Sequence, residues 1–482
     1  MRRFESANAI TCWGAWIAPN RSICTQTAFL SRIAAASSVC ISIYISIKLM
    51  ENKIMQLLTA NRNTVFKKTA APVGRLPGTD VANVRAGDSF NVQYAFQVGQ
   101  HCFVRLQDAL GTVGKIGYFP LSDVHVPIQE ARGVWLTTTD SDVLKSKSNI
   151  QAGLKQLKGL GFNTIYPVVW QSGFTLFPSA VAASVIGSKI MPDPAFAGRN
   201  MLAEIVDEAK TQGFRVIPWF EYGLMTPPGS QLAITHPDWL TAVNDKGDTI
   251  RTKRADREKD DQVWLNPCRP EVQQFMVDLI AEVAEQYDVD GVQLDDHFGF
   301  PVELGYDRFT QNLFKAENSG AAAPKDHTDP KWVDWASGKV TDLLRRIFHA
   351  VKAKRPDCLI SISPNPLSFS KEHYLADWNN WVQAGLAEEI VLQVYRDTVT
   401  SFRDELLKPE VSDTHDHIPL SIGVLSGLRT QRVAFALIEN QIKESRNRSY
   451  TGVSCFFYET LFNETLTPSK ARNLSDLKTI FP

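Results

Sequence analysis

The sequence lacks a net charge large enough to draw the protein to a charged polymer. Its 51 lysine and arginine residues nearly balance 52 aspartate and glutamate residues, which leaves a formal net charge of −1 at pH 7. A basic face or stripe is what brings a protein to phosphate backbones. The balance therefore argues against nucleic acid as a partner.

The cysteines lack the spacing of a zinc ribbon or a disulfide framework. There are seven of them. They are scattered and odd in number, and no two form a CxxC pair, so neither kind of framework is expected. Cys358 and Cys455 stand inside apolar, strand-like runs. We expect them to be small buried thiols.

A long hydrophobic run is also missing. Arg2 and Arg3 are followed by an apolar stretch, Ile33–Ile47, which is closed by Lys48. This stretch is shorter than the roughly 20 residues of a membrane span. Residues 1–56 are therefore treated as a leader with two interpretations. In the first interpretation the leader is a poor signal or anchor, which would place the protein in the cell envelope or periplasm. Otherwise the true start is Met50 or Met55, and the protein is cytoplasmic.

Residues 57–127 have an all-β texture. Short apolar runs such as Ser89–Tyr94 and Cys102–Leu106 are separated by glycine-bearing turns, which is the pattern of hairpins. The segment resembles a bacterial SH3-like module. We expect it to hold a polymeric substrate, with cell-wall association as the consequence. The alternative is that it packs over one end of the following domain and stabilises it.

The pattern changes after Pro127, where apolar runs alternate with helix-period segments such as Val272–Tyr287. Such alternation is typical of βαβ units and a parallel sheet. Eight units over residues 131–482 predict an α/β fold, a (β/α)8 TIM barrel preceded by the small all-β SH3-like barrel. A doubly wound sheet would need a Gly-rich turn after its first strand, and Thr137–Asp140 is not one. The predicted strands are Gly133–Thr137, Thr164–Val169, Arg215–Phe220, Gly291–Asp295, Leu359–Ser363, Ile390–Tyr395, Pro419–Val424 and Gly452–Tyr458.

Connection lengths indicate which rim of the barrel carries the site. Helix-to-strand connections are short, whereas the connections after strands two, three and four are long: Gln171–Arg199, Glu221–Arg269 and Asp296–Lys331. Barrel enzymes build their active sites from the loops at the carboxyl ends of the strands. The site is therefore expected at that rim.

Strand four supplies the first catalytic candidate. Side chains alternate between the two faces of a strand. If Val292 and Leu294 face the helices, Gln293 and Asp295 point into the barrel, with Asp295 at its mouth. A carboxylate placed there by chance would be costly to bury. We predict that Asp295 is catalytic; the alternative is a structural carboxylate that ties loops together. Asp296 has the opposite parity and is expected to orient the loop or His297.

Glycoside hydrolysis uses two carboxyl groups, and two glutamates qualify as the second. Glu221 ends strand three and Glu459 ends strand eight, each beside aromatic residues. Desolvation there would raise the pKa of either carboxyl toward that of a working acid. The expected substrate-binding set combines polar residues near the ends of the strands with aromatic residues, whose flat faces suit sugars. It comprises Trp135, Trp170, Trp219, Tyr222, Gln293, Asp296, His297, Asn365, Gln393, Tyr395 and Arg396.

Six ordered motifs together resemble the glycosyl-hydrolase-like 10 family. The resemblance implies a TIM barrel that hydrolyses glycan strands, with bacterial cell-wall glycan as the substrate. A more distant resemblance to the α-amylase clan implies a nucleophile at the position of Asp295. The motifs are Arg132–Leu136, Asn163–Pro167, Pro218–Glu221, Trp264–Pro267, Asp290–His297 and Gln393–Arg396.

Two other functions compete with this interpretation. A non-catalytic sugar-binding barrel would keep the aromatic residues without a carboxyl pair. A metal-dependent hydrolase would need a ligand cluster, and the His415–His417 segment precedes strand seven, at the wrong end of the barrel. Asp295, Asp296 and His297 have suitable ligand types, but three consecutive strand residues are not expected to converge. We therefore expect neither a metal nor another cofactor, and a polysaccharide as the partner.

Overall fold

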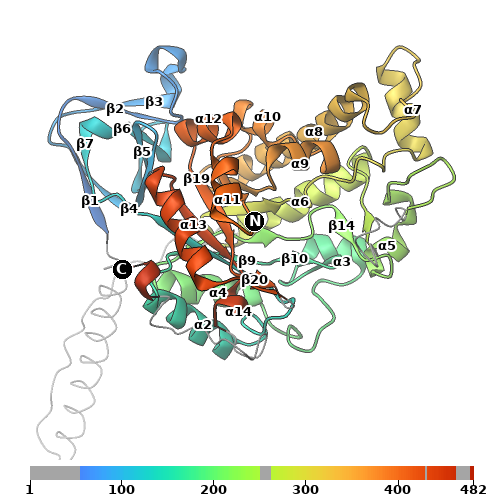
Figure 1. Ribbon diagram of the computed structural model, residues 1–482, viewed down its shortest axis with the longest axis horizontal. Coiled ribbons are helices and arrows are strands. Elements are labelled where there is room, and N and C mark those ends of the chain that lie inside the picture. The colour runs from blue at the N-terminus through green and yellow to red at the C-terminus, as the bar shows by residue number, and fades with distance from the viewer. Residues whose placement is uncertain (1–54, 250–261, 429–430, 463–477, 482) are drawn as a thin grey trace, which may run out of the picture. The chain divides into compact units, whose positions relative to one another are not determined.

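The computed structural model describes residues 55–249, 262–428, 431–462 and 478–481 (Figure 1). The leader expected over residues 1–56 lies outside these ranges except for its last two residues. Within them, no helix combines the length and apolar character needed to cross a membrane.

The first part of this structure is an antiparallel sheet, as the all-β texture predicted. Its seven strands lie in the order β3-β2-β6-β5-β4-β1-β7. Leu58, Phe66, Val92 and Phe119 are among the buried residues that form its core. The likeness to an SH3-like module stays a prediction. The strands are β1 Gln56–Ala60, β2 Thr64–Lys67, β3 Val81–Val84, β4 Ser89–Val98, β5 His101–Leu110, β6 Gly114–Pro120 and β7 Val124–His125.

A parallel sheet comes next in the chain, in the order β12-β9-β8-β22-β19-β18-β17-β16-β13. The two ends of this order, β12 and β13, are consecutive in the chain and separated only by Ile217 and Pro218. The Ile217 amide donates to Ile165 on one side, and the Pro218 carbonyl accepts from Gln293 on the other. The interrupted strand thus closes the sheet on itself. The strands are β8 Ala131–Leu136, β9 Thr164–Pro167, β12 Arg215–Val216, β13 Trp219–Phe220, β16 Gly291–Asp295, β17 Leu359–Ser363, β18 Glu389–Gln393, β19 Leu420–Leu425 and β22 Gly452–Phe456.

Each predicted strand overlaps these segments, the third spanning both β12 and β13, but the predicted end of the eighth was wrong. Strand β22 stops at Phe456, and Tyr458 begins a helix. The apolar run Phe456–Tyr458 continues past the strand because the helix also buries its first residue, Tyr458.

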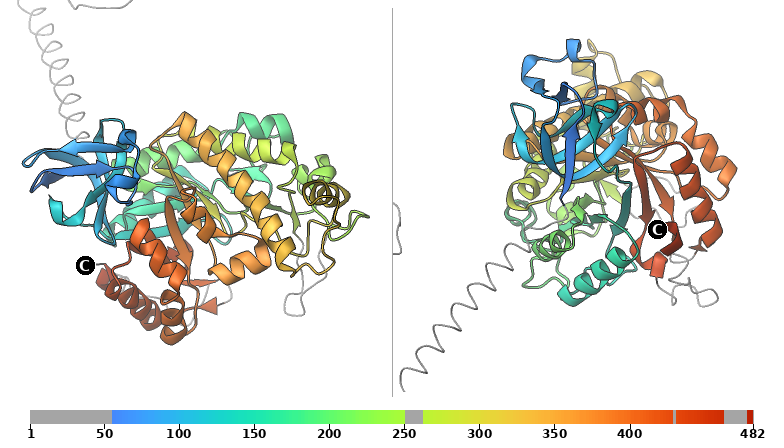
Figure 2. Two further views of the ribbon diagram at one scale, coloured as in Figure 1. Left: turned by 90° about the horizontal axis from the view of Figure 1, so that it is seen from above. Right: turned by 90° about the vertical axis from the view of Figure 1, so that its left-hand side faces the viewer.

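The helices surround the parallel strands (Figures 1 and 2). Helix α6 has Pro270 at its first position, where a missing N–H removes no helical bond, and it buries an apolar face that includes Phe275 and Leu279. The helices are α2 Lys147–Gly159, α3 Ala180–Ile186, α4 Met201–Thr211, α5 Gln231–Thr235, α6 Pro270–Gln286, α7 Arg308–Glu317, α8 Pro330–Lys354, α9 Leu367–Tyr374, α10 Trp378–Gln383, α11 Val399–Leu406, α12 Pro409–His417, α13 Phe435–Asn447 and α14 Tyr458–Phe462.

The long connections lie after β9, β13 and β16, at the carboxyl rim, as predicted. They carry helices α3, α5 and α7 and two short hairpin pairs. The pairs are β10 Trp170–Gln171 with β11 Phe174–Thr175, and β14 Met225–Thr226 with β15 Val263–Trp264. A third pair, β20 Gly427–Leu428 with β21 Gln431–Arg432, comes after β19.

The antiparallel sheet packs on the opposite end of the barrel, where the parallel strands begin (Figure 2). The Arg215 guanidinium lies 4.7 Å from the ring centre of Tyr94 and 5.2 Å from that of Phe96. Arg105 of β5 forms a 2.5 Å ion pair with Asp357, and Ala131 and Leu359 join one apolar cluster with the sheet. These contacts fit the alternative in which residues 57–127 pack over one end of the following domain, and the targeting role stays a prediction.

Four cysteines lie in the described ranges, Cys102, Cys268, Cys358 and Cys455. All four are buried. The expectation of buried thiols at Cys358 and Cys455 is confirmed.

Candidate active site

Asp295 ends β16 with its side chain inside the barrel mouth and only 4% exposed. The parallel register sets it beside Ser363 of β17. Ser363 donates to Asp295 Oδ1 at 3.1 Å, and Gln393 Nε2, from the end of β18, donates to the same oxygen at 2.9 Å. Three neighbouring strands therefore position this carboxyl.

Asp296 and His297 converge on the same place. Asn365 Nδ2 donates to Asp296 Oδ2 at 2.6 Å. His297 Nδ1 lies 3.4 Å from Asp295 Oδ2 and 3.5 Å from Asp296 Oδ1. The expectation that these three consecutive residues would not converge was wrong. Strand alternation stops at Asp295, and the turn after it brings the next two side chains back toward the mouth.

Ligand atoms of Asp295, Asp296 and His297 lie within 4.8 Å of one another, so these residues have the composition of a cation site. In the His297 ring only Nε2 could serve as the ligand atom for such a cation. Its Nδ1 lies 2.9 Å from the backbone carbonyl oxygen of Glu221. A carbonyl oxygen only accepts, so Nδ1 carries the proton of this hydrogen bond and has no free lone pair for a metal.

Glu221 directly follows β13, which pairs with β16. Its carboxyl accepts hydrogen bonds from Gln171 Nε2 at 2.8 Å and from Thr137 Oγ1 at 3.2 Å. Burial raises the pKa of this carboxyl to about 7. Glu221 is therefore largely protonated in mildly acidic solution, where an ordinary glutamate is ionised.

The other titratable groups are also strongly shifted. Burial and the neighbouring Asp296 raise the pKa of Asp295 well above its ordinary value. Burial alone would lower the pKa of His297, but the carboxylates of Asp296 and Asp295 raise it to about 10. His297 is thus a cation at neutral pH, enclosed by acidic groups. Such clustering of shifted groups is typical of functional sites.

Three buried polar groups around this cluster have no hydrogen-bond partner among the described residues: Trp219 Nε1, Trp264 Nε1 and Tyr395 Oη. The Trp264 ring centre lies 6.0 Å from that of His297. The carboxylates of Asp295 and Asp296 help raise the pKa of Tyr395. Buried donors without partners are rare in folded proteins, and a polar ligand would satisfy them.

The model of the family described as glycosyl hydrolase-like 10 matches residues 130–444. The chain belongs to this family. The resemblance seen in the sequence motifs is confirmed for the barrel.

Named relatives also match this chain. Glycosyl hydrolase DigH of Escherichia coli (strain K12) is 27% identical over 316 residues, which cover 55% of this chain and 66% of the relative. Glycosyl hydrolase YngK of Bacillus subtilis (strain 168) is 23% identical over 303 residues, covering 55% of this chain and 54% of the relative. The chain thus spans less than two thirds of the length of either relative.

Two solved structures align with this chain. The glycoside hydrolase domain of PgaB (BpsB) from Bordetella bronchiseptica aligns with a TM-score of 0.53 at 13% identity, covering 73% of this chain and 99% of that domain. The catalytic domain of β-amylase from Paenibacillus polymyxa aligns with a TM-score of 0.50 at 12% identity, covering 73% and 97%. These likenesses show a fold resembling glycoside hydrolase TIM barrels.

Several predicted site residues of this family member lie outside the Asp295 cluster. Trp135 Nε1 donates to Gln293 Oε1 at 2.8 Å, one strand layer beneath Asp295. Trp170 is fully buried and donates to the Gly223 carbonyl. Arg396 forms a 2.7 Å ion pair with Glu405.

The two remaining predictions concern Tyr222 and Glu459. Tyr222 is half-buried next to Glu221 and shares a hydrogen bond with Ser172. Glu459 lies in α14 and accepts hydrogen bonds from Ser141 Oγ and the Asp142 amide, at 3.0 and 3.1 Å. It thereby ties α14 to the loop after β8. Glu221, in contrast, is joined to the Asp295 cluster through His297.

Sequence reasoning did not single out Gln171 and Trp264. Gln171 comes after Trp170 at the start of the first long connection, and Trp264 opens one of the six family motifs. A polar residue at the start of an elaborated loop was the available signal for Gln171.

Proposed function

We propose that the protein hydrolyses O-glycosidic bonds in a polysaccharide, with Glu221 as the general acid and Asp295 as the nucleophile or base. Bacterial cell-wall glycan is the substrate class that the family resemblance suggests. The names of the relatives and the fold of glycoside hydrolases support the reaction class.

One observation carries the proposal. Two carboxyls, the half-buried Glu221 and the buried Asp295, stand at the ends of adjacent strands, and both have a raised pKa. His297 Nδ1 contacts the Glu221 carbonyl oxygen and the Asp295 carboxylate. Glycoside hydrolysis needs a pair of this kind, one protonated and one ionised. The His297 cation stabilises the ionised form of Asp295.

The chemistry requires Glu221 protonated and Asp295 ionised. The Glu221 carboxyl gives its proton to the glycosidic oxygen as the bond from that oxygen to the anomeric carbon breaks. The ionised Asp295 either attacks that carbon or takes a proton from the water that attacks it. Trp219, Trp264 and Tyr395 offer their unpartnered polar groups to sugar hydroxyls.

The test is digestion of defined glycan strands, with and without stem peptides, by the wild type and by Asp295→Asn. The amide keeps the shape of the side chain and removes its charge. We expect the variant to fold and to lose cleavage by a factor of about 100 or more, the order expected for a lost catalytic group. Proton NMR of the first product gives its anomeric configuration.

Asp296→Asn is the matched control, because Asp296 follows the end of β16 and its carboxyl is hydrogen-bonded to Asn365. We expect a smaller loss for this variant. If the wild type binds the strands without cleaving them, the protein is a sugar-binding barrel. If Asp295→Asn cleaves within a few-fold of the wild type, Asp295 has no catalytic role.

A further inference from the structure

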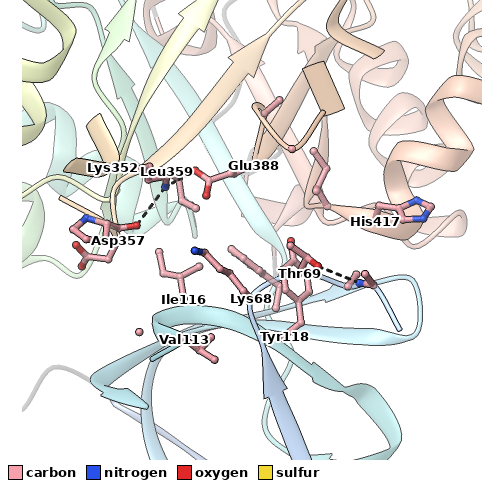
Figure 3. Close-up of a pocket in the computed structure, with 18 of the residues that line it drawn as sticks. Lys68, Thr69, Val113, Ile116, Tyr118, Lys352, Asp357, Leu359, Glu388 and His417 are labelled. Carbon is pink, nitrogen blue, oxygen red and sulfur yellow. Dashed lines mark hydrogen bonds and ion pairs between the residues drawn. The ribbon is translucent and has the colours of Figure 1, made fainter. Parts of the chain in front are cut away.

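A second site lies at the end of the barrel opposite Asp295. A cavity of about 660 Å³ opens between the antiparallel sheet and the starts of the barrel strands (Figure 3). Its walls include Ile116 and Tyr118 of β6, Leu359 at the start of β17, and Phe348 of α8. The volume is in the range of small-molecule sites, which are mostly apolar with a few polar groups.

The charges of the cavity are unevenly paired. Its two carboxylates already have cationic partners: Asp357 is 2.5 Å from Arg105, and Glu388 is 2.6 Å from Lys352.

Two further lysines, Lys68 and Lys115, line the same space. In the part of the chain that the structure describes, neither ammonium has an ion-pair or hydrogen-bond partner. Figure 3 shows Lys68 reaching from the sheet into the space below Leu359. The cavity thus offers unpaired positive charge beside apolar walls.

We propose that this cavity binds a small amphipathic carboxylate, with the carboxylate at Lys68 and Lys115 and the apolar body against Ile116, Leu359 and Phe348. Charge complementarity selects an anion, because both acidic groups of the lining are neutralised within the protein. The apolar walls favour a ligand with an apolar body, because removing apolar surface from water is favourable in free energy. Since the walls come from both the sheet and the barrel, the ligand stabilises their contact.

This site is separate from the proposed chemistry. Leu359, Glu388 and Ile418 of the lining stand at or before the starts of β17, β18 and β19, whereas Asp295 stands at the end of β16. In such barrels the end where strands begin serves stability and the other end serves catalysis. Binding is therefore expected to raise Tm and to be unaffected by Asp295→Asn.

Decanoate, below its micelle concentration, is the probe, with decanol and decylammonium as neutral and cationic molecules of the same chain length. Titration calorimetry on the full chain is expected to give one decanoate site with at least tenfold tighter binding than decanol and none for decylammonium. Lys68→Gln combined with Lys115→Gln is expected to weaken decanoate binding at least fivefold. Lys155→Gln, an exposed lysine of α2 outside the cavity, is the matched control.

Three results would overturn the proposal. The first is the absence of a saturable decanoate site in the wild type. The second is equal binding of decanol, which would make the cavity merely apolar. The third is unchanged decanoate binding in the double lysine variant, which would place the ligand elsewhere. Circular dichroism and Tm of each variant confirm that it is folded.

Discussion

At the scale of single residues, Glu221 is connected to Asp295 by one imidazole. The His297 ring contacts a carbonyl of one residue and the carboxyl of the other. The ring thereby contacts the backbone of the first acidic residue and the side chain of the second. The ionisation of Glu221 then decides the pH range in which the pair works.

We expect the cleavage rate to fall as the pH rises through about 7. The acid must be protonated to act, and burial sets the pKa of Glu221 at about 7. The free energy of unfolding depends on the same ionisation. A carboxyl whose pKa is raised by folding contributes stability at low pH, and this contribution is lost as the pH rises from about 4.5 to about 7.

Glu221→Gln checks both effects. The variant is expected to lose the fall in rate above pH 7 and most of its activity on glycan strands. It should retain activity on aryl glycosides, whose leaving groups need little protonation. A fall near pH 7 that persists in Glu221→Gln would assign it to another group. Unfolding by urea at pH 5 and pH 9 measures the stability effect.

We expect cleavage to survive treatment with EDTA. His297 Nδ1 is engaged as a donor to Glu221, and Asp295 and Asp296 accept hydrogen bonds from Gln393 and Asn365. The proposed acid and base steps use the protons and charges of these side chains and need no metal. The test compares cleavage rates before EDTA treatment, after it, and after Mn²⁺ or Zn²⁺ is added back. Inhibition that added metal reverses would instead make the three clustered residues a metal site.

At the scale of elements, the sequence predicted side-chain directions inside a strand better than those in the turn after it. The alternation in β16 placed Gln293 and Asp295 on the inner face, and the structure agrees. Asp296 and His297 come after the strand, where backbone turns and not alternation set the direction of a side chain. Partners such as Gln171 come from distant loops, which no local pattern can locate.

The pairing of β22 with β8 depends on a glycine. A Cβ added to Gly452 would lie 1.9 Å from the Ala131 carbonyl oxygen, far inside van der Waals contact. Because that oxygen belongs to the paired backbone, neither partner can move freely. We expect Gly452→Ala to lower the free energy of unfolding by about 2 kcal/mol or more.

Gly338→Ala is the matched control in α8. A Cβ there meets nothing within 4 Å, so the substitution is expected to raise the free energy of unfolding by about 0.5–1 kcal/mol. Denaturant titration of both variants measures the two changes. Equal stability of Gly452→Ala and wild type would mean that the β22–β8 junction adjusts its spacing without loss.

At the scale of the whole molecule, the antiparallel sheet packs against the barrel through side-chain contacts. Arg105 and Tyr94 of the sheet contact Asp357 and Arg215 at the starts of barrel strands. The sequence showed a boundary near Pro127 but not this contact, because it joins residues far apart in the chain. The change near Pro127, from an all-β pattern to alternating strand and helix patterns, suggested an independent module.

A chain that begins at Ile128 is therefore expected to be less stable than the full chain. Removing the sheet exposes Ala131 and Leu359 and leaves Arg215 without its aromatic neighbours. We expect a lower Tm and equal losses of activity on soluble oligosaccharides and insoluble polymer. Activity lost on the polymer alone, with Tm unchanged, would restore the targeting role.

The buried thiols offer a way to watch these parts come apart. Burial raises the pKa of Cys102, Cys268 and Cys358 to about 12, so each reacts with iodoacetamide only when its surroundings open. Cys102 belongs to the antiparallel sheet, Cys358 immediately precedes β17 beside it, and Cys268 lies ahead of α6. Mass-spectrometric timing of alkylation at each thiol thus gives a separate opening rate for each region. If the sheet opens before the barrel, Cys102, which lies in the core of the sheet, is labelled before Cys358, which lies in the core of the barrel.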